Sequence, residues 1–433
     1  MKLEDYIERH ARLHADKMAV VSENRQLSYS ELWQLVSARA ANYRRGQAVV
    51  FRASQDIDFL VTYFAIHLAG GIAVPLGSDA PDHLLAQTAR SLAGHPIPED
   101  TADVLFTTGT TGHSKGVMVS HRAILADAEN LIEGQHFCHE LVFIVSGPLN
   151  HIGSLSKLYP VMMLGATVYL LEGMKDLGRF FHALDFPCQK MATFLVPASV
   201  RILTQLCGNK LAAYAHKIDF IESGGAPLPH SDMQALCRLL PKSRLYNTYA
   251  STETGIVSTY NYNDGRCLAG CLGRPMSHSR IAITKEGKIA CQGNTLMSGY
   301  VGDALLTATV LRDDTVYMSD YGSIDGEGML HIGGRETDVI NIGGYKVSPV
   351  EVEEAALAMP GVKDCVCIAV PHKITGNALK LMVVMTEKES FDKRKMALFL
   401  KSKLETYKVP MLYELVDAVK RTYNGKIDRK AYS

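Results

Sequence analysis

The sequence predicts an α/β protein whose large N-terminal domain contains parallel-rich sheets flanked by helices, followed by a small α+β C-terminal domain. Three observations support this fold class. Strands and helices alternate through the first half, short strands punctuated by glycine follow, and the last ~100 residues have the length of a separate domain. With 433 residues, the chain is also too long for one compact core.

The first half contains the elements expected of a parallel sheet with helices on its faces. Ser28 and Glu31 have the spacing of a capping box and open a helix that Gly46 closes. Strands at 48–51 and 72–75 enclose a helix at 56–69. The pattern then recurs with strands at 141–145, 166–171, 191–196 and 220–222.

In the second half, glycine-punctuated short strands over 267–299 predict a small β-barrel-like region. We place the domain boundary near 335–338, which gives an N-terminal domain of residues 1–335 and a C-terminal domain of residues 336–433. A second capping box, Ser348 to Glu351 with proline at the first helical position, opens the C-terminal domain's first helix. The elements expected there are a helix at 350–358, strands at 365–370 and 379–386, and a helix at 391–407.

Composition excludes several classes of partner. Hydrophobic residues make up 47% and charged residues 21%, with a formal net charge of zero. This balance gives no electrostatic basis for binding nucleic acid or an anionic membrane. The charged start of the chain is unlike a signal peptide, and no apolar run is long enough to span a bilayer. We therefore expect a protein that does not insert into membranes. The nine cysteines lack zinc-site spacing, so we expect them to be core thiols in the reducing cytoplasm.

The most informative segment is 105–117, where an apolar strand runs into a loop of glycines and hydroxyl residues with one lysine. Glycines let the backbone approach an anion closely, and amides and hydroxyls can surround phosphate oxygens. Lys115 adds a positive charge. The spacing is not that of the Walker loop, so the sequence predicts a phosphate site of another kind. The residues expected to surround phosphate are Thr107, Thr108, Gly109, Thr110, Thr111 and Gly112.

This loop resembles the signature loop of the adenylate-forming superfamily, which includes acyl-CoA synthetases, peptide-synthetase adenylation domains and luciferases. Further segments resemble the family's motifs in the same order. Residues 223–227 resemble the turn that lines adenine, implying roles for Gly224, Gly225 and Ala226. Residues 249–253 resemble Tyr-Gly-x-Thr-Glu, although Ala250 replaces the glycine. The resemblance implies that Tyr249 stacks on adenine, Thr252 holds the α-phosphate and Glu253 ligates Mg²⁺.

The remaining matches lie near and beyond the predicted boundary. Asp320 falls where the family binds the ribose hydroxyls, although Met318-Ser319 replaces Thr-Gly, and Arg335 falls where the family's arginine contacts the nucleotide. Thr337 stands at the hinge position, which a mobile C-terminal domain needs. Gly343, Gly344 and Tyr345 resemble the thiol-tunnel loop, and Lys426 matches the catalytic lysine.

The acyl-substrate pocket is predicted by position alone. His151, in a Pro-Leu-x-His segment, resembles a histidine of acyl- and aryl-CoA synthetases, and a purely structural histidine is an equal alternative. No aspartate stands where amino-acid-activating relatives bind ammonium, which argues against an α-amino acid. The expected lining residues are Val196, Ser199, Thr248, Ala250 and Ser251.

The resemblance implies an enzyme that uses ATP and Mg²⁺ to convert a small-molecule carboxylic acid to its acyl-adenylate, releasing pyrophosphate. Coenzyme A would then take the acyl group, and Lys115, Lys426 and Glu253 with its Mg²⁺ would neutralise charge. Loading of an acyl carrier protein's phosphopantetheine is the alternative, and a non-catalytic nucleotide-binding relative is a third. The protein is expected to be a monomer or a homodimer.

Overall fold

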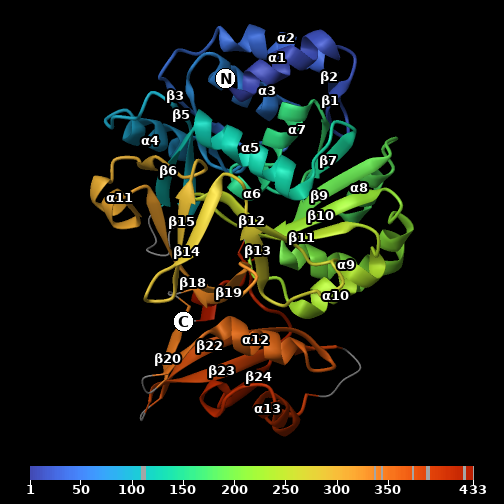
Figure 1. Ribbon diagram of the computed structural model, residues 1–433, viewed down its shortest axis with the longest axis vertical. Helices are drawn as coiled ribbons and strands as arrows, with labels where there is room; N and C mark the ends of the chain where they lie inside the picture. Colours follow the sequence, from blue (N-terminus) through green and yellow to red (C-terminus); the bar gives the residue numbers. More distant parts are fainter. Residues whose placement is uncertain are drawn as a thin grey trace.

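The computed structural model describes residues 1–108, 114–335, 338–342, 345–372, 375–386, 391–422 and 426–432. Figure 1 shows a large upper part and a smaller lower part that begins at β20, with the C-terminus at their junction. The predicted α/β fold class is confirmed. The boundary between residues 335 and 336 stays a prediction, because residues 336 and 337, and so Thr337, lie outside the described residues.

A five-stranded sheet at the top carries the predicted phosphate loop. Its strand order is β16-β6-β5-β4-β3, with β3, β4 and β5 parallel and β5–β6 an antiparallel hairpin. The capping box is confirmed, because the Ser28 hydroxyl accepts a hydrogen bond from the Glu31 amide and the Glu31 carboxylate accepts one from the Ser28 amide. The helix ends at Ala40, however, and Gly46 takes a positive φ of 70° in the turn before β3. The elements are α1 (Leu3–Leu13), α2 (Tyr29–Ala40), β3 (Ala48–Arg52), α3 (Ile57–Leu68), β4 (Ile72–Leu76), α4 (Asp82–Leu92), β5 (Thr101–Thr108), β6 (Ser114–Ser120) and α5 (His121–Gln135).

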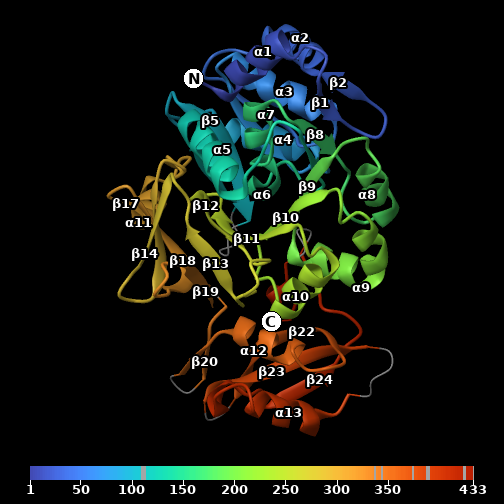
Figure 2. The ribbon, with the colours of Figure 1, turned by 45° about the vertical axis from the view of Figure 1, so that its right-hand side comes forward.

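The second sheet has 14 strands, and its middle is parallel. Figures 1 and 2 show α8, α9 and α10 along one side of β9, β10 and β11, with α5, α6 and α7 on the other. A hydrophobic core lies on each face. The predicted strand at 141–145 is confirmed without change, and 220–222 is the middle of a longer strand. The elements are β1 (Met18–Val21), β2 (Gln26–Ser28), β7 (Leu141–Val145), α6 (Ile152–Leu155), α7 (Leu158–Leu164), β8 (Thr167–Leu170), α8 (Leu177–Leu184), β9 (Lys190–Leu195), α9 (Pro197–Ala213), β10 (Ile218–Gly224), α10 (His230–Leu239), β11 (Arg244–Ser251) and β12 (Gly255–Asn261).

The glycine-punctuated region forms antiparallel strands around a core of its own, but the strand order is open and no pairing closes the predicted barrel among the described residues. It continues the 14-stranded sheet, because β13 pairs with β12 on one side and β19 on the other. The elements are β13 (Cys271–Pro275), β14 (Ser279–Ile283), β15 (Lys288–Gly293), β16 (Gly299–Tyr300), α11 (Ala304–Val310), β17 (Leu311–Arg312), β18 (Thr315–Ile324) and β19 (Leu330–Arg335).

The lower part has a three-stranded sheet with its own hydrophobic core. The second capping box is wrong: Ser348 precedes the helix, but its hydroxyl makes no capping hydrogen bond and Glu351 accepts from Lys408 instead. The helix expected at 391–407 breaks into α13 and a 3₁₀ turn, with Asp392 as the N-cap. The elements are β20 (Ile340–Ile342), β21 (Tyr345–Val347), α12 (Pro349–Leu357), β22 (Val362–His372), β23 (Gly376–Met385), α13 (Lys393–Lys401), η1 (Thr406–Lys408), β24 (Leu412–Leu415) and η2 (Arg429–Tyr432).

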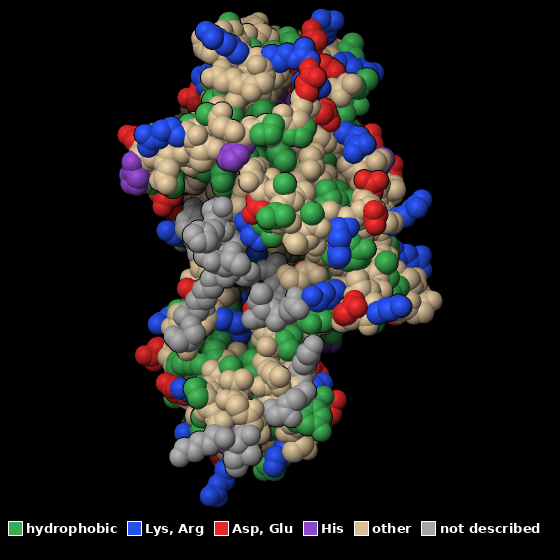
Figure 3. All heavy atoms as spheres, turned by 90° about the vertical axis from the view of Figure 1, so that its left-hand side faces the viewer, with side chains coloured by type: hydrophobic (Ala, Val, Ile, Leu, Met, Phe, Trp, Pro, Cys, Tyr) green, Lys and Arg blue, Asp and Glu red, His purple; other side chains and the backbone are tan. Residues whose placement is uncertain are grey.

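The surface agrees with the zero net charge. On the face in Figure 3, lysine and arginine side chains are interspersed with aspartate and glutamate. Within the part of the chain that the structure describes, no helix is both long and apolar enough to cross a membrane.

Candidate active site

The strands on either side of the predicted phosphate loop form a hairpin that positions Lys115. In its register Thr107 lies opposite Lys115, so the two strands bring them together across residues 109–113. Gly109, Thr110, Thr111 and Gly112 lie outside the described residues, as does the side chain of Thr108. Their contacts with phosphate therefore stay predictions.

Lys115 and Glu253 are brought together by a residue that the sequence analysis missed. Strand β16 pairs with β6 so that Tyr300 lies opposite Val117. The Tyr300 hydroxyl donates a 3.0 Å hydrogen bond to Glu253 Oε1, and Lys115 Nζ lies 5.5 Å from the centre of the Tyr300 ring. An ammonium near a ring face is stabilised by the ring's quadrupole. One aromatic side chain thus holds a cation and a carboxylate from distant segments of the chain.

Tyr249 and Asp320, both predicted to bind the nucleoside, contact each other. The Tyr249 hydroxyl donates a 2.7 Å hydrogen bond to Asp320 Oδ2, and both side chains are buried. The two residues come from β11 and β18, which are not neighbours in the sheet. Asp320 also lies opposite Arg335 on β19, whose side chain is outside the described residues. The predicted ring-binding and ribose-binding positions are therefore adjacent.

The departure from the family pattern at Met318 has a packing explanation. Met318 is buried in the same hydrophobic cluster as Tyr249 and Val257, so its side chain belongs to the core of the antiparallel region. The predicted ribose ligand, Asp320, keeps its place two residues later on the strand. The replacement of Thr-Gly therefore changes the packing beneath the predicted site while Asp320 remains.

The segment at the end of β10, which is predicted to line adenine, packs closely against β11. Gly224 lies opposite Thr248 in the sheet, and a Cβ atom on Gly224 would stand only 3.0 Å from the Thr248 carbonyl oxygen. Gly225 takes a positive φ of 80°, which favours glycine. Ala226 follows directly. Segments 223–227 and 248–253 therefore run side by side, as a shared nucleotide site requires.

Lys426 approaches His151 although 275 residues separate them in the sequence. Burial lowers the pKa of His151, and the positive charge of Lys426 lowers it further, so His151 is neutral at neutral pH. Lys426 is exposed and directly precedes Ile427, which forms a β-bridge with Arg421. The C-terminus lies at the junction of the two parts in both ribbon views (Figures 1 and 2), which agrees with this approach.

Among the described residues, no contact places the predicted thiol-tunnel segment beside His151. Tyr345 is exposed and stacks on Tyr407 of the lower part, with ring centres 4.7 Å apart. Gly343 and Gly344 lie outside the described residues. The structure thus associates Lys426, rather than Tyr345, with His151.

The residues predicted to line the acyl pocket lie at the start of α9 and on β11, and the pocket itself stays a prediction. Val196 is the N-cap of α9, and Ser199 lies in the first turn of that helix. Thr248, on β11, shares hydrogen bonds with Gln135 and Thr259. Ala250 is partly buried against the hydrophobic core that contains α5 and α7. The Ser251 hydroxyl bonds to Thr254, which tightens the turn that carries Thr252 and Glu253.

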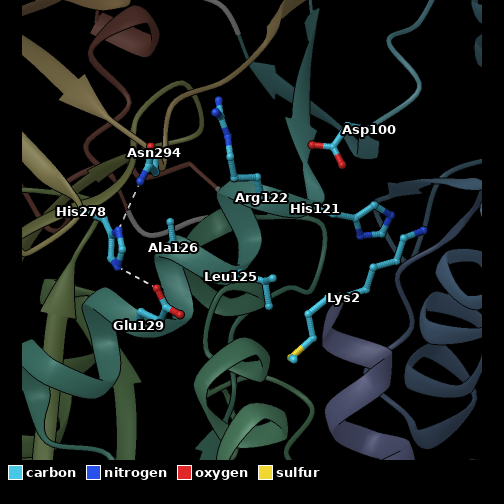
Figure 4. Close-up of a pocket in the computed structure, with 10 residues that line it drawn as sticks. Lys2, Asp100, His121, Arg122, Leu125, Ala126, Glu129, His278 and Asn294 are labelled. Atoms are coloured by element: carbon cyan, nitrogen blue, oxygen red, sulfur yellow. Dashed lines mark hydrogen bonds and ion pairs between the residues drawn. The ribbon is translucent and has the colours of Figure 1, made fainter.

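A separate pocket lies between α1, α5 and the start of β14 (Figure 4). His278 crosses it with a 2.7 Å contact from Nε2 to Glu129 and a hydrogen bond to Asn294. None of the residues predicted for the active site lines this pocket.

Comparisons with known proteins agree with the predicted family. The sequence profile of the AMP-binding enzyme family matches residues 7–93 and 88–301, and that of the AMP-binding enzyme C-terminal domain matches residues 351–426. A feruloyl-CoA synthase of Amycolatopsis sp is 28% identical, over 97% of this chain and 96% of its own length. An indoleacetate–CoA ligase of Aromatoleum aromaticum is 25% identical, over 99% and 96%.

Solved structures confirm the fold. ATP-bound MatB from Rhodopseudomonas palustris matches with a TM-score of 0.86 at 24% identity, covering 100% of this chain and 99% of that chain. The apo form of the same protein gives 0.78. Together, the two profile matches and the fold establish that this chain belongs to the AMP-binding enzyme family.

Proposed function

We propose that this protein is an ATP-dependent acid–CoA ligase that forms an acyl-adenylate and then an acyl-CoA thioester. The observation that carries the proposal is the approach of Lys426 to His151 at the junction of the two parts. It supports a site in which a C-terminal lysine acts on a substrate bound in the large part. The CoA-ligase names of the relatives support the acid and the acceptor.

Adenylation needs positive charge, because a carboxylate attacks the α-phosphorus of an anionic nucleotide and the bond to pyrophosphate breaks. Lys115 and Lys426 supply two positive charges. Glu253 is suited to hold Mg²⁺, which would neutralise phosphate charge, since it offers hard oxygen ligands. Tyr300 donates to one of these oxygens and so fixes the orientation of the carboxylate.

Tyr249 and Asp320 would bind the nucleoside. Their mutual hydrogen bond holds a ring and a carboxylate in fixed positions, so little side-chain entropy is lost when the nucleoside binds. In the second step the thiol sulfur attacks the acyl carbon, and AMP leaves as the mixed anhydride breaks. Neutral His151 on the carboxylate side of the site avoids placing a further full charge beside the reacting group.

The test separates the two steps in Lys426→Ala. We expect pyrophosphate release, with hydroxylamine trapping across a panel of acids, to fall at least a hundredfold. A supplied acyl-AMP should still be converted to acyl-CoA by the variant. Lys420→Ala, an exposed lysine near the same turn, is the control that should keep both activities. Equal loss of both steps in Lys426→Ala would contradict the proposed role of Lys426. If the wild-type protein released no pyrophosphate with any acid of the panel, the proposed ligase function would be contradicted.

A further inference from the structure

A buried ion pair lies in the large part, beside Phe194 on β9. Lys157, between α6 and α7, donates a 2.7 Å hydrogen bond to Glu222 on β10. The side-chain exposures are 0% and 1%. Removing two charges from water costs several kcal/mol per ion, and apolar side chains of similar volume are often as stabilising. A pair in this position therefore calls for a role beyond stability.

The pair is only partly satisfied. Glu222 Oε2 is buried and has no hydrogen-bond partner among the described residues. An ammonium has three donor hydrogens, and Glu222 takes one. A second neighbour of Lys157 is the face of Phe194, whose centre lies 5.3 Å from Nζ. The pair thus presents an acceptor oxygen and donor hydrogens that a bound molecule could use.

Phe194 links this pair to the predicted site. It lies opposite Glu222 in the sheet, on β9. A Cβ atom on Gly224 would be 3.5 Å from the Phe194 ring, and one on Gly153 would be 3.2 Å from it. Gly224 belongs to the predicted adenine-lining turn. The ion pair and this turn therefore share one aromatic neighbour.

The position of Lys157 relative to His151 indicates which end of the bound acid would face the ion pair. Lys157 follows His151 by six residues through a largely helical segment, which corresponds to a rise of about 9 Å. His151 lies near Lys426, where the carboxylate of the acid would react. The ion pair would then face the end of the acid remote from its carboxylate.

The ionisable side chains around the ion pair carry no net charge. Asp127 is the other acid close to Lys157, and burial raises the pKa of Asp127 to about 8, against the effects of its bond to the Ile256 amide and of Lys157. At neutral pH it is therefore mostly protonated, so Lys157 and Glu222 form a neutral pair. A carboxylate on the substrate would face Glu222 without a hydrogen to donate, and an ammonium would face Lys157 without an acceptor.

We propose that Lys157 and Glu222 together recognise a hydroxyl group at the end of the acid remote from its carboxylate. This rests on the proposed function, since it assigns the substrate class of the same site. The hydroxyl donates to Glu222 Oε2 and accepts from Lys157 Nζ, which satisfies both groups at once. An acid without the hydroxyl leaves the buried oxygen unpaired, and this penalty gives the selectivity.

The experiment measures kcat/KM by ATP–pyrophosphate exchange with matched acids. The probes are 4-hydroxybenzoate against benzoate, 3-(4-hydroxyphenyl)propanoate against 3-phenylpropanoate, and 8-hydroxyoctanoate against octanoate. We expect at least one hydroxy acid to exceed its partner a hundredfold or more. If every pair gave a ratio within tenfold, the proposal would be overturned while the ligase function stands. A preference for the 4-amino or 4-carboxy analogue of a hydroxy acid over that hydroxy acid would have the same consequence. No exchange with any acid would overturn both.

A double variant tests whether the pair itself discriminates. Lys157→Met with Glu222→Leu removes both charges and leaves neither one buried alone. We expect the hydroxy preference to fall below tenfold, with the KM for ATP unchanged. Lys408→Met with Glu351→Leu removes a 2.6 Å pair in the lower part that is more exposed to solvent, and this variant should keep the preference. If the hydroxy preference survives in Lys157→Met with Glu222→Leu, the assignment of the hydroxyl site to this pair is overturned. If that double variant unfolds, the same measurement is made on the more conservative variant Glu222→Gln.

Discussion

Arg201, in α9 of the large part, donates a 2.7 Å hydrogen bond to Asp364, in β22 of the lower part. Asp364 also accepts from Arg421, five residues before Lys426. One carboxylate thus ties the large part both to the lower sheet and to the segment that carries the predicted catalytic lysine. Because Lys426 approaches His151 in this arrangement, the contact should favour the state competent for adenylation.

We therefore expect Asp364→Asn to slow adenylation about tenfold or more, since hydrogen bonds to charged groups contribute roughly 1.5–3 kcal/mol. Thioester formation from a supplied acyl-AMP should change less than twofold. Asp364 is the better site to change, because Arg201 keeps its second partner, Asp232, at 3.0 Å. Asp58→Asn, which removes an exposed ion pair with Arg39, is the control. A parallel fall in both half-reactions would argue against a role in domain arrangement.

Much of this arrangement could be predicted from the sequence, because its signals are local. The capping box at Ser28 and the apolar strand at 141–145 depend on neighbouring residues, and both are confirmed. Ser348 has the same local signal, yet the prediction fails because Lys408, distant in sequence, binds Glu351. Tertiary contacts of this kind are invisible in a short motif.

The same limit applies to the site. The order of the family motifs predicted that Glu253, Tyr249 and Asp320 belong together, but Tyr300 gave no signal of its own. Its position depends on the pairing of β16 with β6, which the sequence alone does not indicate. Pairings across long stretches of chain are set by the packing of the whole sheet.

A second prediction concerns Tyr300. We expect Tyr300→Phe to raise the Mg²⁺ concentration needed for half-maximal pyrophosphate exchange about three- to tenfold, because Glu253 loses the hydrogen bond that orients it. The measurement is a Mg²⁺ titration at saturating ATP and acid. Tyr214→Phe removes a 2.7 Å hydrogen bond to Asp185 on the surface and should leave the titration unchanged. An unaltered Mg²⁺ dependence in Tyr300→Phe would contradict the predicted metal role of Glu253.

A third prediction uses His151 as a reporter of domain arrangement. Burial and the charge of Lys426 both lower its pKa, so Lys426→Met should raise it, while burial keeps it below the ordinary value of 6.5. Histidine NMR spectra recorded across a pH titration, assigned with His151→Asn, measure the change. Lys420→Met should leave the His151 pKa where it is. No shift in Lys426→Met would show that Lys426 does not approach His151 in solution.

A fourth prediction concerns stability and pH. His67, in α3, lies between two buried carboxylates, with Nδ1 3.2 Å from Glu4 and Nε2 3.0 Å from Asp103. Burial alone would lower its pKa, but the two carboxylates, chiefly Asp103, outweigh this and raise it to about 9. The folded protein therefore holds a proton that the unfolded chain releases near pH 6.5. The stability from this proton is fully present below pH 6.5 and is lost as the pH rises through about 9.

Because one pKa unit corresponds to about 1.4 kcal/mol, the wild type should lose up to about 3 kcal/mol from this group between pH 6.5 and 9.5. We expect His67→Gln to be less stable at pH 6.5 but to lose much less stability over the same interval. Urea unfolding at both pH values measures the difference, and subtracting variant from wild type removes the effects of other titrating groups. His83→Gln, on the exposed face of α4, should follow the wild type. Asp103 lies on β5, the strand that leads to Thr107. Loosening the hydrogen bonds around His67 should therefore also raise the KM for ATP under conditions where the protein is still folded. An unchanged KM for ATP in His67→Gln would show that these bonds support the core and not the strand that carries the predicted phosphate loop.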